Sequence, residues 1–261
     1  MRSLSIASTG MLAQQLNVEV ISNNIANLNT TAFKSQRAEF QDLLYQNERD
    51  VGVNSSDSGT VVPVGVQIGS GVKAAAVYRV ATQGNLTTTG NPLDLAIQGK
   101  GYLQVEMPDG STSYTRAGSL QMSATGQLVT ADGYTIAPAI SIPQNTTAVT
   151  INANGQVQAT VAGNATPQVV GQLQLATFPN EGGLSAQGNN LLNETPASGA
   201  ATTGNPGTTA LGTIQQGFLE TSNVNIVSEI TNLIAAQRAY EMNSKVIQTS
   251  DQMMSTLNQI Q

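Results

Sequence analysis

Apolar side chains recur every seven residues along the stretch from about Asn225 to Gln261, and mostly polar side chains fill the positions between them. A seven-residue spacing describes a narrow stripe that packs against another helix. No Gly or Pro interrupts the stretch, and Asn225 is a suitable N-cap, so the pattern predicts one long helix. The residues of the stripe are Ile226, Leu233, Tyr240, Ile247 and Met254, with Ile230 in a second column.

The first thirty residues carry a matching stripe. Gly10 is its one weak point, because a glycine inside a helix costs about 1 kcal/mol relative to alanine. Each helix could simply cover one face of a central domain, but both stripes are narrow and the other positions are mostly polar, so we expect each helix to need a helical partner. The residues of this stripe are Leu4, Met11, Val18 and Ile25, with Ile21 in a second column.

Between Val72 and about Phe178 the hydrophobic pattern changes to period two, as at Leu93, Leu95 and Ile97. Such alternation is typical of β-strands that bury one face. Short strands joined by Gly-containing dipeptides indicate hairpins, and several in series indicate an all-β domain. The dipeptides are Asp109-Gly110, Thr125-Gly126, Asp132-Gly133 and Asn154-Gly155.

The sequence therefore predicts an α+β fold in which long N- and C-terminal helices form a coiled-coil-like domain and a central all-β domain is inserted between them. A stretch rich in Gly, Ser and Val, which includes Asn54 to Gly59, is expected to be an extended arm. The expected boundaries are 1–45 for the N-terminal helix and its exit, 46–71 for the arm, 72–180 for the β domain, 181–217 for a loop-rich return segment that completes the β domain, and 218–261 for the C-terminal helix.

Composition narrows the possible functions. Charged residues make up 10% of the chain and aromatic residues 4%, and the chain has no Trp, Cys or His. Without Cys and His it lacks the usual zinc ligands and the commonest general base, so we expect no metal, no cofactor and no catalytic site. The net charge of -6 argues against a nucleic-acid partner.

Two features bear on location. No apolar run approaches the length of about 18 residues that a membrane-spanning helix needs, so we expect no membrane insertion. The N-terminus has one early charge at Arg2 but no apolar segment of the kind found in secretory signal peptides. If the protein leaves the cytoplasm, we expect a route that does not cleave such a signal.

Two motifs are tempting but weak. Gly99-Lys100-Gly101 lacks the third glycine and the following helix of a nucleotide-binding fingerprint. Asp94, Glu106 and Asp109 could supply the paired acids of a glycosidase that cleaves peptidoglycan. Asp109 lies in a predicted turn, however, and Glu106 is more simply a solvated strand residue.

Residues 23–34 read Asn-Asn-Ile-Ala-Asn-Leu-Asn-Thr-Thr-Ala-Phe-Lys, an unusually Asn-rich end for a helix. This run is similar to a signature of the flagellar rod and hook family, from which it departs at Ala32, where the family usually has Gly. Four further runs resemble the same family in the same order. They are residues 91–102, 114–120, 216–225 and 237–245.

The resemblance implies a subunit that is exported through the flagellar type III apparatus and assembles with copies of itself into a helical homopolymer. The terminal helices would line a hollow shaft, with neighbouring rod and hook proteins at its ends and peptidoglycan- and outer-membrane-associated ring proteins around it. Both helical stripes would then form the assembly seam, together with Phe33. Asn23, Asn24 and Asn27 are expected to make polar contacts between helices or subunits, since an Asn at such a seam fixes its register.

Within the family, the arm that follows Asp42-Leu43-Leu44-Tyr45 resembles the insertion of distal-rod members, where it is linked to a straight, rigid rod. A proximal-rod or hook subunit is the nearest alternative, because these members share the terminal motifs. A secreted β-rich adhesin would explain the Thr-, Asn- and Gly-rich strands but not the paired terminal stripes.

Overall fold

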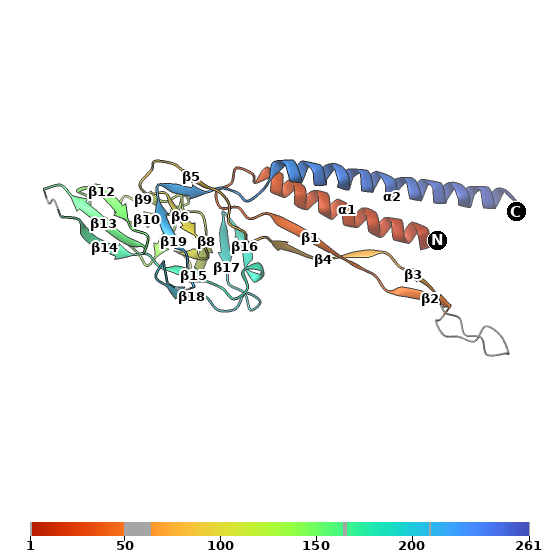
Figure 1. Cartoon of the computed structure of the whole chain (residues 1–261), viewed down its shortest axis with the longest axis horizontal. Helices are drawn as coiled ribbons and strands as arrows, with labels where there is room; N and C mark the ends of the chain where they lie inside the picture. Colours follow the sequence, from red (N-terminus) through yellow and green to blue (C-terminus); the bar gives the residue numbers. More distant parts are fainter. Residues whose placement is uncertain (1, 50–63, 164–165, 209, 261) are drawn as a thin grey trace. The chain divides into compact units, whose positions relative to one another are not determined.

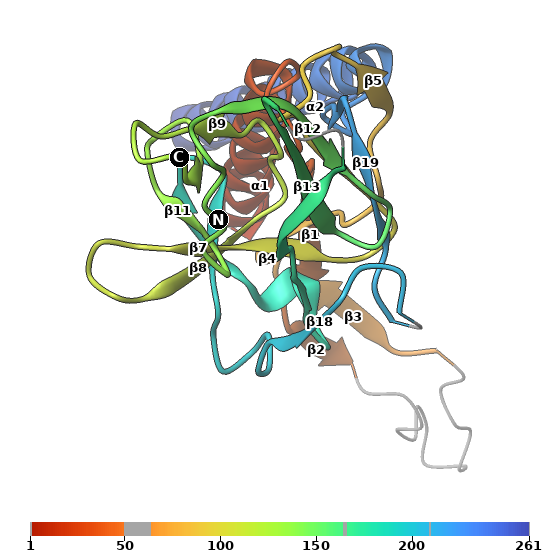
Figure 2. The ribbon, with the colours of Figure 1, turned by 90° about the vertical axis from the view of Figure 1, so that its left-hand side faces the viewer.

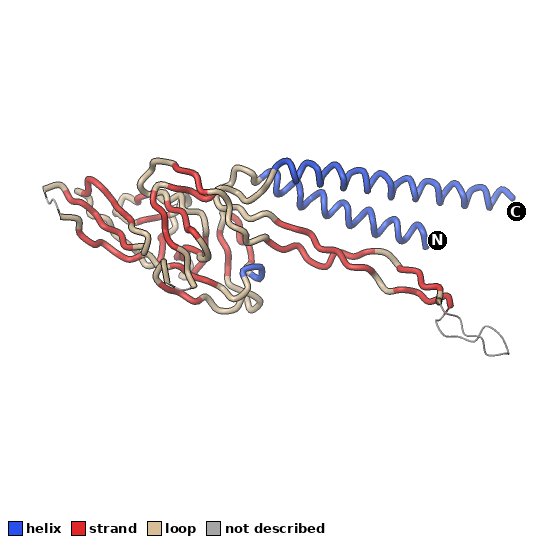
Figure 3. Tube along the Cα trace, in the orientation of Figure 1, coloured by secondary structure: helices blue, strands red, loops and turns tan. Residues whose placement is uncertain are grey.

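The computed structural model describes residues 2–49, 64–163, 166–208 and 210–260. The chain divides into a helical unit of residues 1–26, 36–78 and 225–261 and a β unit of residues 27–35 and 79–224. The predicted α+β class, with a long helix near each end and a β domain between them, is confirmed (Figure 1; Figure 3). Neither helix of the described chain is long and apolar enough to span a membrane.

The helical unit contains α1 (Arg2–Ala26), α2 (Ile226–Ile260) and an antiparallel arm, which lie side by side in Figure 1. In the arm β1 (Gln36–Asp42) pairs with β4 (Val72–Arg79), and β2 (Tyr45–Arg49) pairs with β3 (Val66–Gly69). The arm is longer than the predicted 46–71, because it also includes strands β1 and β4. The predicted N-cap of α2 is confirmed, because the Asn225 side-chain oxygen accepts the N–H groups of Val227 and Ser228 at 3.1 and 3.2 Å.

The β unit is built from short strands (Figure 2). The largest sheet has the order β16-β17-β8-β7-β11-β10-β9, and β15 pairs with both β7 and β18 at its side. A second sheet contains β12, β13 and β14 in that order. Two further pairs are β19 with β6 and β20 with β5. The strands are β5 (Leu86–Thr88), β6 (Leu95–Gln98), β7 (Tyr102–Glu106), β8 (Thr112–Thr115), β9 (Gln121–Met122), β10 (Leu128–Val129), β11 (Thr135–Ala137), β12 (Thr146–Ile151), β13 (Gln156–Val161), β14 (Gln168–Gln172), β15 (Leu175–Thr177), β16 (Ser185–Gly188), β17 (Leu191–Asn193), β18 (Thr202–Gly204), β19 (Thr213–Gln216) and β20 (Phe218–Glu220), with a short 3-10 helix η1 (Glu181–Gly183).

All four predicted hairpin turns are present. Gly110, Gly126, Gly133 and Gly155 have positive φ angles of 81°, 81°, 87° and 81°, and each donates its N–H to the carbonyl three residues earlier. Glycine suits these positions because it has no Cβ to clash in the left-handed region. The turns join β7 to β8, β9 to β10, β10 to β11, and β12 to β13.

The core of the β unit is mainly aliphatic. Its largest cluster contains Leu, Ile and Val side chains such as Leu103, Val157 and Leu175, all at most 1% exposed. A smaller cluster places the ring of Phe178 edge-on to Tyr102 and Tyr114, with centroid distances of 6.0 and 4.8 Å. These geometries suit the charge distribution of aromatic rings.

The structure divides the chain differently from the predicted boundaries in three places. Residues 72–78 were expected in the β domain, but β4 pairs with β1 in the helical unit. Residues 27–35 and 218–224 were expected with the terminal helices and lie in the β unit. Segment 181–217, which was expected as a loop-rich return segment completing the β domain, lies in the β unit and contributes strands β16 to β19. Of the predicted arm, 50–63 lies outside the described residues, and its flanks form β2 and β3.

Ala32 adopts a backbone conformation that alanine disfavours. Its φ angle is +55°, and its N–H donates to the carbonyl of Glu220 at 2.8 Å. A Cβ in the left-handed region costs roughly 1–2 kcal/mol, which glycine avoids. The position at which the sequence departs from the family motif is therefore a strained one.

We predict that Ala32→Gly raises the free energy of unfolding by up to about 1 kcal/mol. Glycine removes the strain of the left-handed conformation, and the extra conformational entropy that glycine loses on folding offsets only part of this gain. Urea denaturation followed by circular dichroism measures the change. Ala186→Gly in the exposed strand β16 is the matched control and should destabilise the protein. A loss of stability in Ala32→Gly would contradict the assignment of strain to Ala32.

Candidate assembly surfaces

The two helices meet antiparallel along a line of small side chains. The hydroxyl oxygens of Ser3 and Ser250 lie 3.4 Å apart, and the side chain of Asn243 occupies the space beside Gly10. A Cβ at Gly10 would lie only 2.8 Å from the Asn243 amide nitrogen. Gly10, which the sequence presented as a weak point, is therefore a position where α2 approaches α1 closely.

Several small residues of the two helices are buried. Seven-residue spacing relates Ala236, Asn243 and Ser250 on α2, and it relates Ser3 and Gly10 on α1. Ala236 and Ser250 are buried, as are Ala7 and Ala13 on α1. The helix pair is thus a heptad packing in which small side chains allow a close approach.

The predicted large apolar stripe flanks this line instead of forming it. On α1, Ile21 is buried, whereas Leu4, Met11, Val18 and Ile25 are half-buried. On α2, Leu233, Ile247 and Met254 are half-buried, whereas Ile226, Ile230 and Tyr240 are exposed. The role of these residues in contacts between subunits stays a prediction.

A second side of α1 packs on the arm. The buried amide of Asn24 donates to the carbonyl of Gln36 at 2.9 Å and accepts the Gln36 N–H at 2.8 Å. The hydroxyl of Thr9 accepts the N–H of Val72 at 3.3 Å. Arg2 pairs with Glu48 on β2. α1 is therefore held between α2 and the arm.

This packing corrects one predicted contact and leaves the others as predictions. Asn24 was expected to bond between helices or subunits, but both of its polar groups bond β1 of the same chain, and it is 2% exposed. Asn23 lies on an exposed part of α1. Asn27 and Phe33 lie in the β unit, where the Asn27 side-chain oxygen accepts the hydroxyl of Thr30 at 3.0 Å.

α2 also carries large apolar side chains that are 45–71% exposed in the described chain. Residues spaced i, i+3 and i+7, or i, i+4 and i+11, share a helix face. Exposed apolar patches of this kind mark contact surfaces in soluble proteins. We call these side chains the exposed α2 set: Val227, Ile230, Ile234, Met242, Val246 and Met253.

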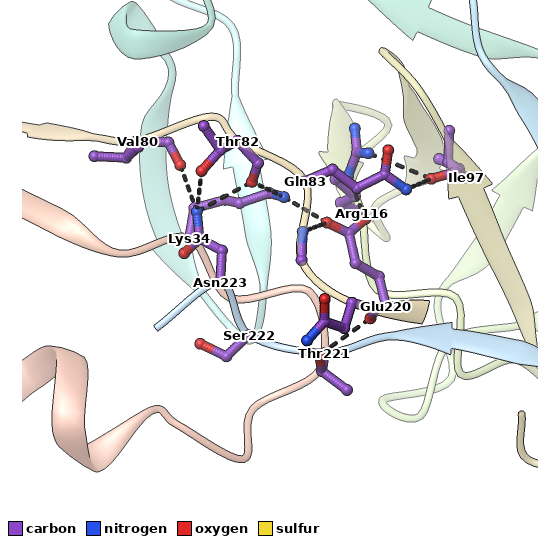
Figure 4. A network of polar contacts seen from close by, with 12 residues as sticks. Lys34, Val80, Thr82, Gln83, Ile97, Arg116, Glu220, Thr221, Ser222 and Asn223 are labelled. Atoms are coloured by element: carbon purple, nitrogen blue, oxygen red, sulfur yellow. Dashed lines mark hydrogen bonds and ion pairs between the residues drawn. The ribbon is translucent and has the colours of Figure 1, made fainter. Parts of the chain in front are cut away.

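Inside the β unit, one buried carboxylate faces two buried cations (Figure 4). The two oxygens of Glu220 lie 2.5 Å from the Lys34 ammonium and 2.6 Å from the Arg116 Nε. Glu220 is 1% exposed, Lys34 9% and Arg116 7%. Buried charges persist only when paired and hydrogen-bonded, and the remaining donors are satisfied here as well.

Arg116 reaches the backbone of β6 and of the loop between β6 and β7. Its guanidinium donates to the carbonyls of Gly99 at 2.7 Å, Gly101 at 3.1 Å and Ile97 at 3.3 Å. The Gly99-Lys100-Gly101 run, which superficially resembles part of a nucleotide motif, is therefore the acceptor cradle for Arg116.

The environment lowers the pKa of both Glu220 and Lys34, the partners of the central ion pair. Burial alone raises the pKa of Glu220, but the charge of Arg116 and the hydrogen bonds from Lys34 and the Gly84 N–H outweigh it and hold the pKa below 4.5. Burial lowers the pKa of Lys34, and the hydrogen bond that Lys34 donates to Glu220 only partly offsets this because Arg116 adds a repulsive charge. The single carboxylate of Glu220 therefore forms ion pairs with two cations.

The candidate acids of the glycosidase alternative do not gather in this way. The Asp94 carboxylate is buried and accepts the Asn91 amide at 3.0 Å. Glu106 is exposed on β7, and Asp109 accepts the hydroxyl and the N–H of Ser111 in a turn. Across the described ranges, no three His, Cys, Asp or Glu side chains are placed to hold a metal ion.

Sequence reasoning missed the ionic cluster. Lys34, Arg116 and Glu220 lie in three of the family-like runs, 23–34, 114–120 and 216–225, which the fold brings together. The available signal was the scarcity of charge, since only 10% of residues are charged, yet each of these runs contains one. Their partnership could not be found from spacing, because 186 positions separate Lys34 from Glu220.

The fold and its surfaces define a structural protein with paired terminal helices, an inserted β unit and apolar side chains exposed along one helix. Comparison with known families agrees with this class. Residues 4–34 match the description "Flagella basal body rod protein", residues 96–159 match "Flagellar hook protein FlgE/F/G D1 domain", and residues 215–260 match "Flagellar basal body rod FlgEFG protein C-terminal".

Individual proteins match along the full length. The chain is 59% identical over 260 residues to the "Flagellar basal-body rod protein FlgG" of Caulobacter vibrioides, covering 100% of this chain and 99% of that protein. It is 54% identical to the protein of that name from Agrobacterium fabrum, with 99% and 98% covered, and 38% identical to the one from Bacillus subtilis, with 98% of each covered. The chain belongs to the flagellar basal-body rod protein family.

Enlarging Gly10 tests the helix contact. We predict that Gly10→Val lowers the free energy of unfolding by about 1–3 kcal/mol, because the added side chain displaces Asn243 and forces the helices apart. Urea denaturation monitored by helical circular dichroism measures it. Ser8→Val, at an exposed position of the same helix, should have little effect, and Asn243→Ala should partly rescue Gly10→Val. Equal stability of Gly10→Val and the unmodified chain would rule out the contact.

The ionic cluster predicts an acid-sensitive β unit. Because the pKa of Glu220 is below 4.5 in the folded protein, its stabilisation is fully present above pH 4.5 and is lost as the pH falls through the lowered pKa. Glu220→Gln should cost about 3–5 kcal/mol at pH 7, since two buried cations lose their counter-charge. Urea titrations at pH 3 to 7 should show a weaker pH dependence in Glu220→Gln. An unchanged pH slope would show that Glu220 does not control acid stability.

Proposed function

We propose that the chain is a structural subunit of the distal part of the flagellar rod. It polymerises helically through its terminal helices into a hollow, rigid drive shaft that transmits motor torque to the hook. Membership of the rod family supports this proposal, as do the full-length relatives named basal-body rod proteins. Its work is mechanical and not enzymatic.

The proposal implies specific partners. Copies of the chain contact one another and the neighbouring rod and hook proteins, and peptidoglycan- and outer-membrane-associated ring proteins surround the shaft. The type III export apparatus delivers the subunit, and the assembled shaft crosses the periplasm. The net charge of -6 fits a protein with no nucleic-acid partner.

The observation that carries the proposal is the exposed α2 set. Met242 is 68% exposed and Val227 71% exposed, although both are large apolar residues on an ordered helix. α1 already satisfies the small-residue side of α2 within the chain, so these side chains remain for a second copy. A helical polymer needs such heterologous contacts, which do not close on themselves.

The arm supports the distal assignment. Beyond Asp42-Leu43-Leu44-Tyr45 the chain continues as β2 and β3, with Tyr45, Val66 and Ile68 exposed. In the proposal, residues 46–71 contact neighbouring subunits and stiffen the shaft. A straight polymer follows from this, in contrast to the curved polymer of a hook.

We predict that the purified chain forms straight filaments in electron micrographs and that Met242→Glu raises the critical concentration by roughly 100-fold, because burying one Met side chain contributes about 2–3 kcal/mol. Gln248→Glu introduces the same charge at an exposed polar position of α2 and should assemble normally. Circular dichroism of both monomers checks that α2 is intact. Filaments of Met242→Glu at the unmodified concentration would overturn the role of the exposed α2 set, and curved filaments would overturn the distal assignment.

A further inference from the structure

The cations of the β unit gather at one end of strand β7. Lys100 comes two residues before β7, and Arg116 directly follows β8, the antiparallel neighbour of β7, so both lie at the start of β7. Lys34 joins this group through its shared partner Glu220. Arg79 is close enough to Tyr102, the first residue of β7, for an electrostatic interaction. The cationic residues of the unit are Lys34, Arg79, Lys100 and Arg116.

Exposed carboxylates occupy the other end of β7. Glu106 is the last residue of β7, and Asp109 lies in the turn that leads to β8. Asp132 lies in the turn before β11, whose first residue Thr135 is paired with Glu106. All three carboxylates are exposed, and none forms an ion pair within the described ranges. The ends of β7 lie roughly 14 Å apart at about 3.4 Å per residue, so these acids do not reach the cations of their own chain.

A surface cavity of about 420 Å³ lies at the cationic end. Lys100 and Arg116 line it, and Glu181 supplies the carboxylate of the lining. The hydroxyl of Tyr102 donates to Glu181 at 3.1 Å, so this carboxylate already has a partner. Two cations against one acid give the cavity a net positive charge among the described residues. An anionic group of a ligand therefore fits it better than a cationic one.

Two donors in the cavity remain available. Arg116 donates to one carboxylate and to three carbonyls, which leaves one of its five N–H groups without an acceptor in the described chain. Lys100 is exposed, and its ammonium has no ion pair within the described residues. Gln83 braces the wall beside them, because it donates to the carbonyl of Ile97 at 3.1 Å and accepts the N–H of Gly99 at 3.0 Å (Figure 4). A carboxylate can accept from both a guanidinium and an ammonium.

We propose that the acidic end of the β unit of one copy docks against this cavity in a second copy, where Lys100 and Arg116 receive its carboxylates. A second copy fits because the chain itself carries exposed, unpaired charges of the opposite sign on a different surface of the same unit. The contact joins unlike surfaces, so it repeats from copy to copy without closing. Opposite charges set the partner and the register of such a contact more than its affinity. Its place in a helical shaft rests on the proposed function, in which it is a second link between subunits in addition to the exposed α2 set.

Exchanging the charges tests the contact in filaments. At about 0.1 M salt, where charges still interact over about 10 Å, Lys100→Glu should raise the critical concentration at least about tenfold, because like charges then face each other. Adding Glu106→Lys, Asp109→Lys or Asp132→Lys to Lys100→Glu restores the net charge of the unmodified chain, which controls for net charge. At least one of these three combinations should restore assembly. Normal assembly of Lys100→Glu, or no rescue by any combination, would overturn the contact.

Carbodiimide cross-linking tests the contact independently of filaments. The reagent activates a carboxylate, which then forms an amide bond with an ammonium group in contact with it, while the carbodiimide leaves as a urea. In a concentrated mixture of isotopically labelled and unlabelled chains, Lys100 of one form should be joined to Glu106, Asp109 or Asp132 of the other. Lys73, which is exposed on β4, is the matched control and should give far fewer of these links.

The outcomes of cross-linking separate the contact from the proposed function. Links between chains at Lys100 but not at Lys73 support the contact even when no filaments form, in which case the proposed function alone fails. Filaments without these links, or equal links at both lysines, overturn the contact and leave the proposed function standing.

Discussion

The structure of the helical unit depends on the close approach of α1 and α2 where Gly10 faces Asn243. Small side chains let the helices meet within one chain, so the pairing demanded by two narrow stripes is met without a second subunit. The exposed α2 set is then available for other contacts. Intrachain pairing and intersubunit assembly thus use different sides of the same helix.

A second constraint acts in the β unit, where Glu220 draws together segments from both halves of the sequence. Its bonds to Lys34 and Arg116 unite motifs near both ends with one from the middle of the chain. Breaking a buried ion pair is costly because a charge is left without a partner. The buried ion pairs therefore tie three segments that are distant in the sequence together within the β unit.

Local patterns predicted much of this fold. The long helices, the Asn225 cap and the four glycine turns follow from short-range periodicity and backbone sterics, which the sequence displays directly. The β1–β4 arm and the bonds of Asn24 were missed because they depend on distant partners. A heptad pattern locates a stripe but does not reveal whether its large residues or the small residues beside them make the contact, and at Gly10 the small residues do.

The central claim is that α1 packs against α2 of its own chain. It is tested most directly by Ser3→Cys with Ser250→Cys, whose hydroxyl oxygens lie 3.4 Å apart in the unmodified chain, a separation suited to a disulfide after small adjustments. Oxidised filaments grown from mixed isotopically labelled and unlabelled chains distinguish the two linkages by mass spectrometry. The account predicts disulfides within single chains and straight filaments. Disulfides that join labelled to unlabelled chains would show that α1 pairs with a neighbouring subunit and would contradict it.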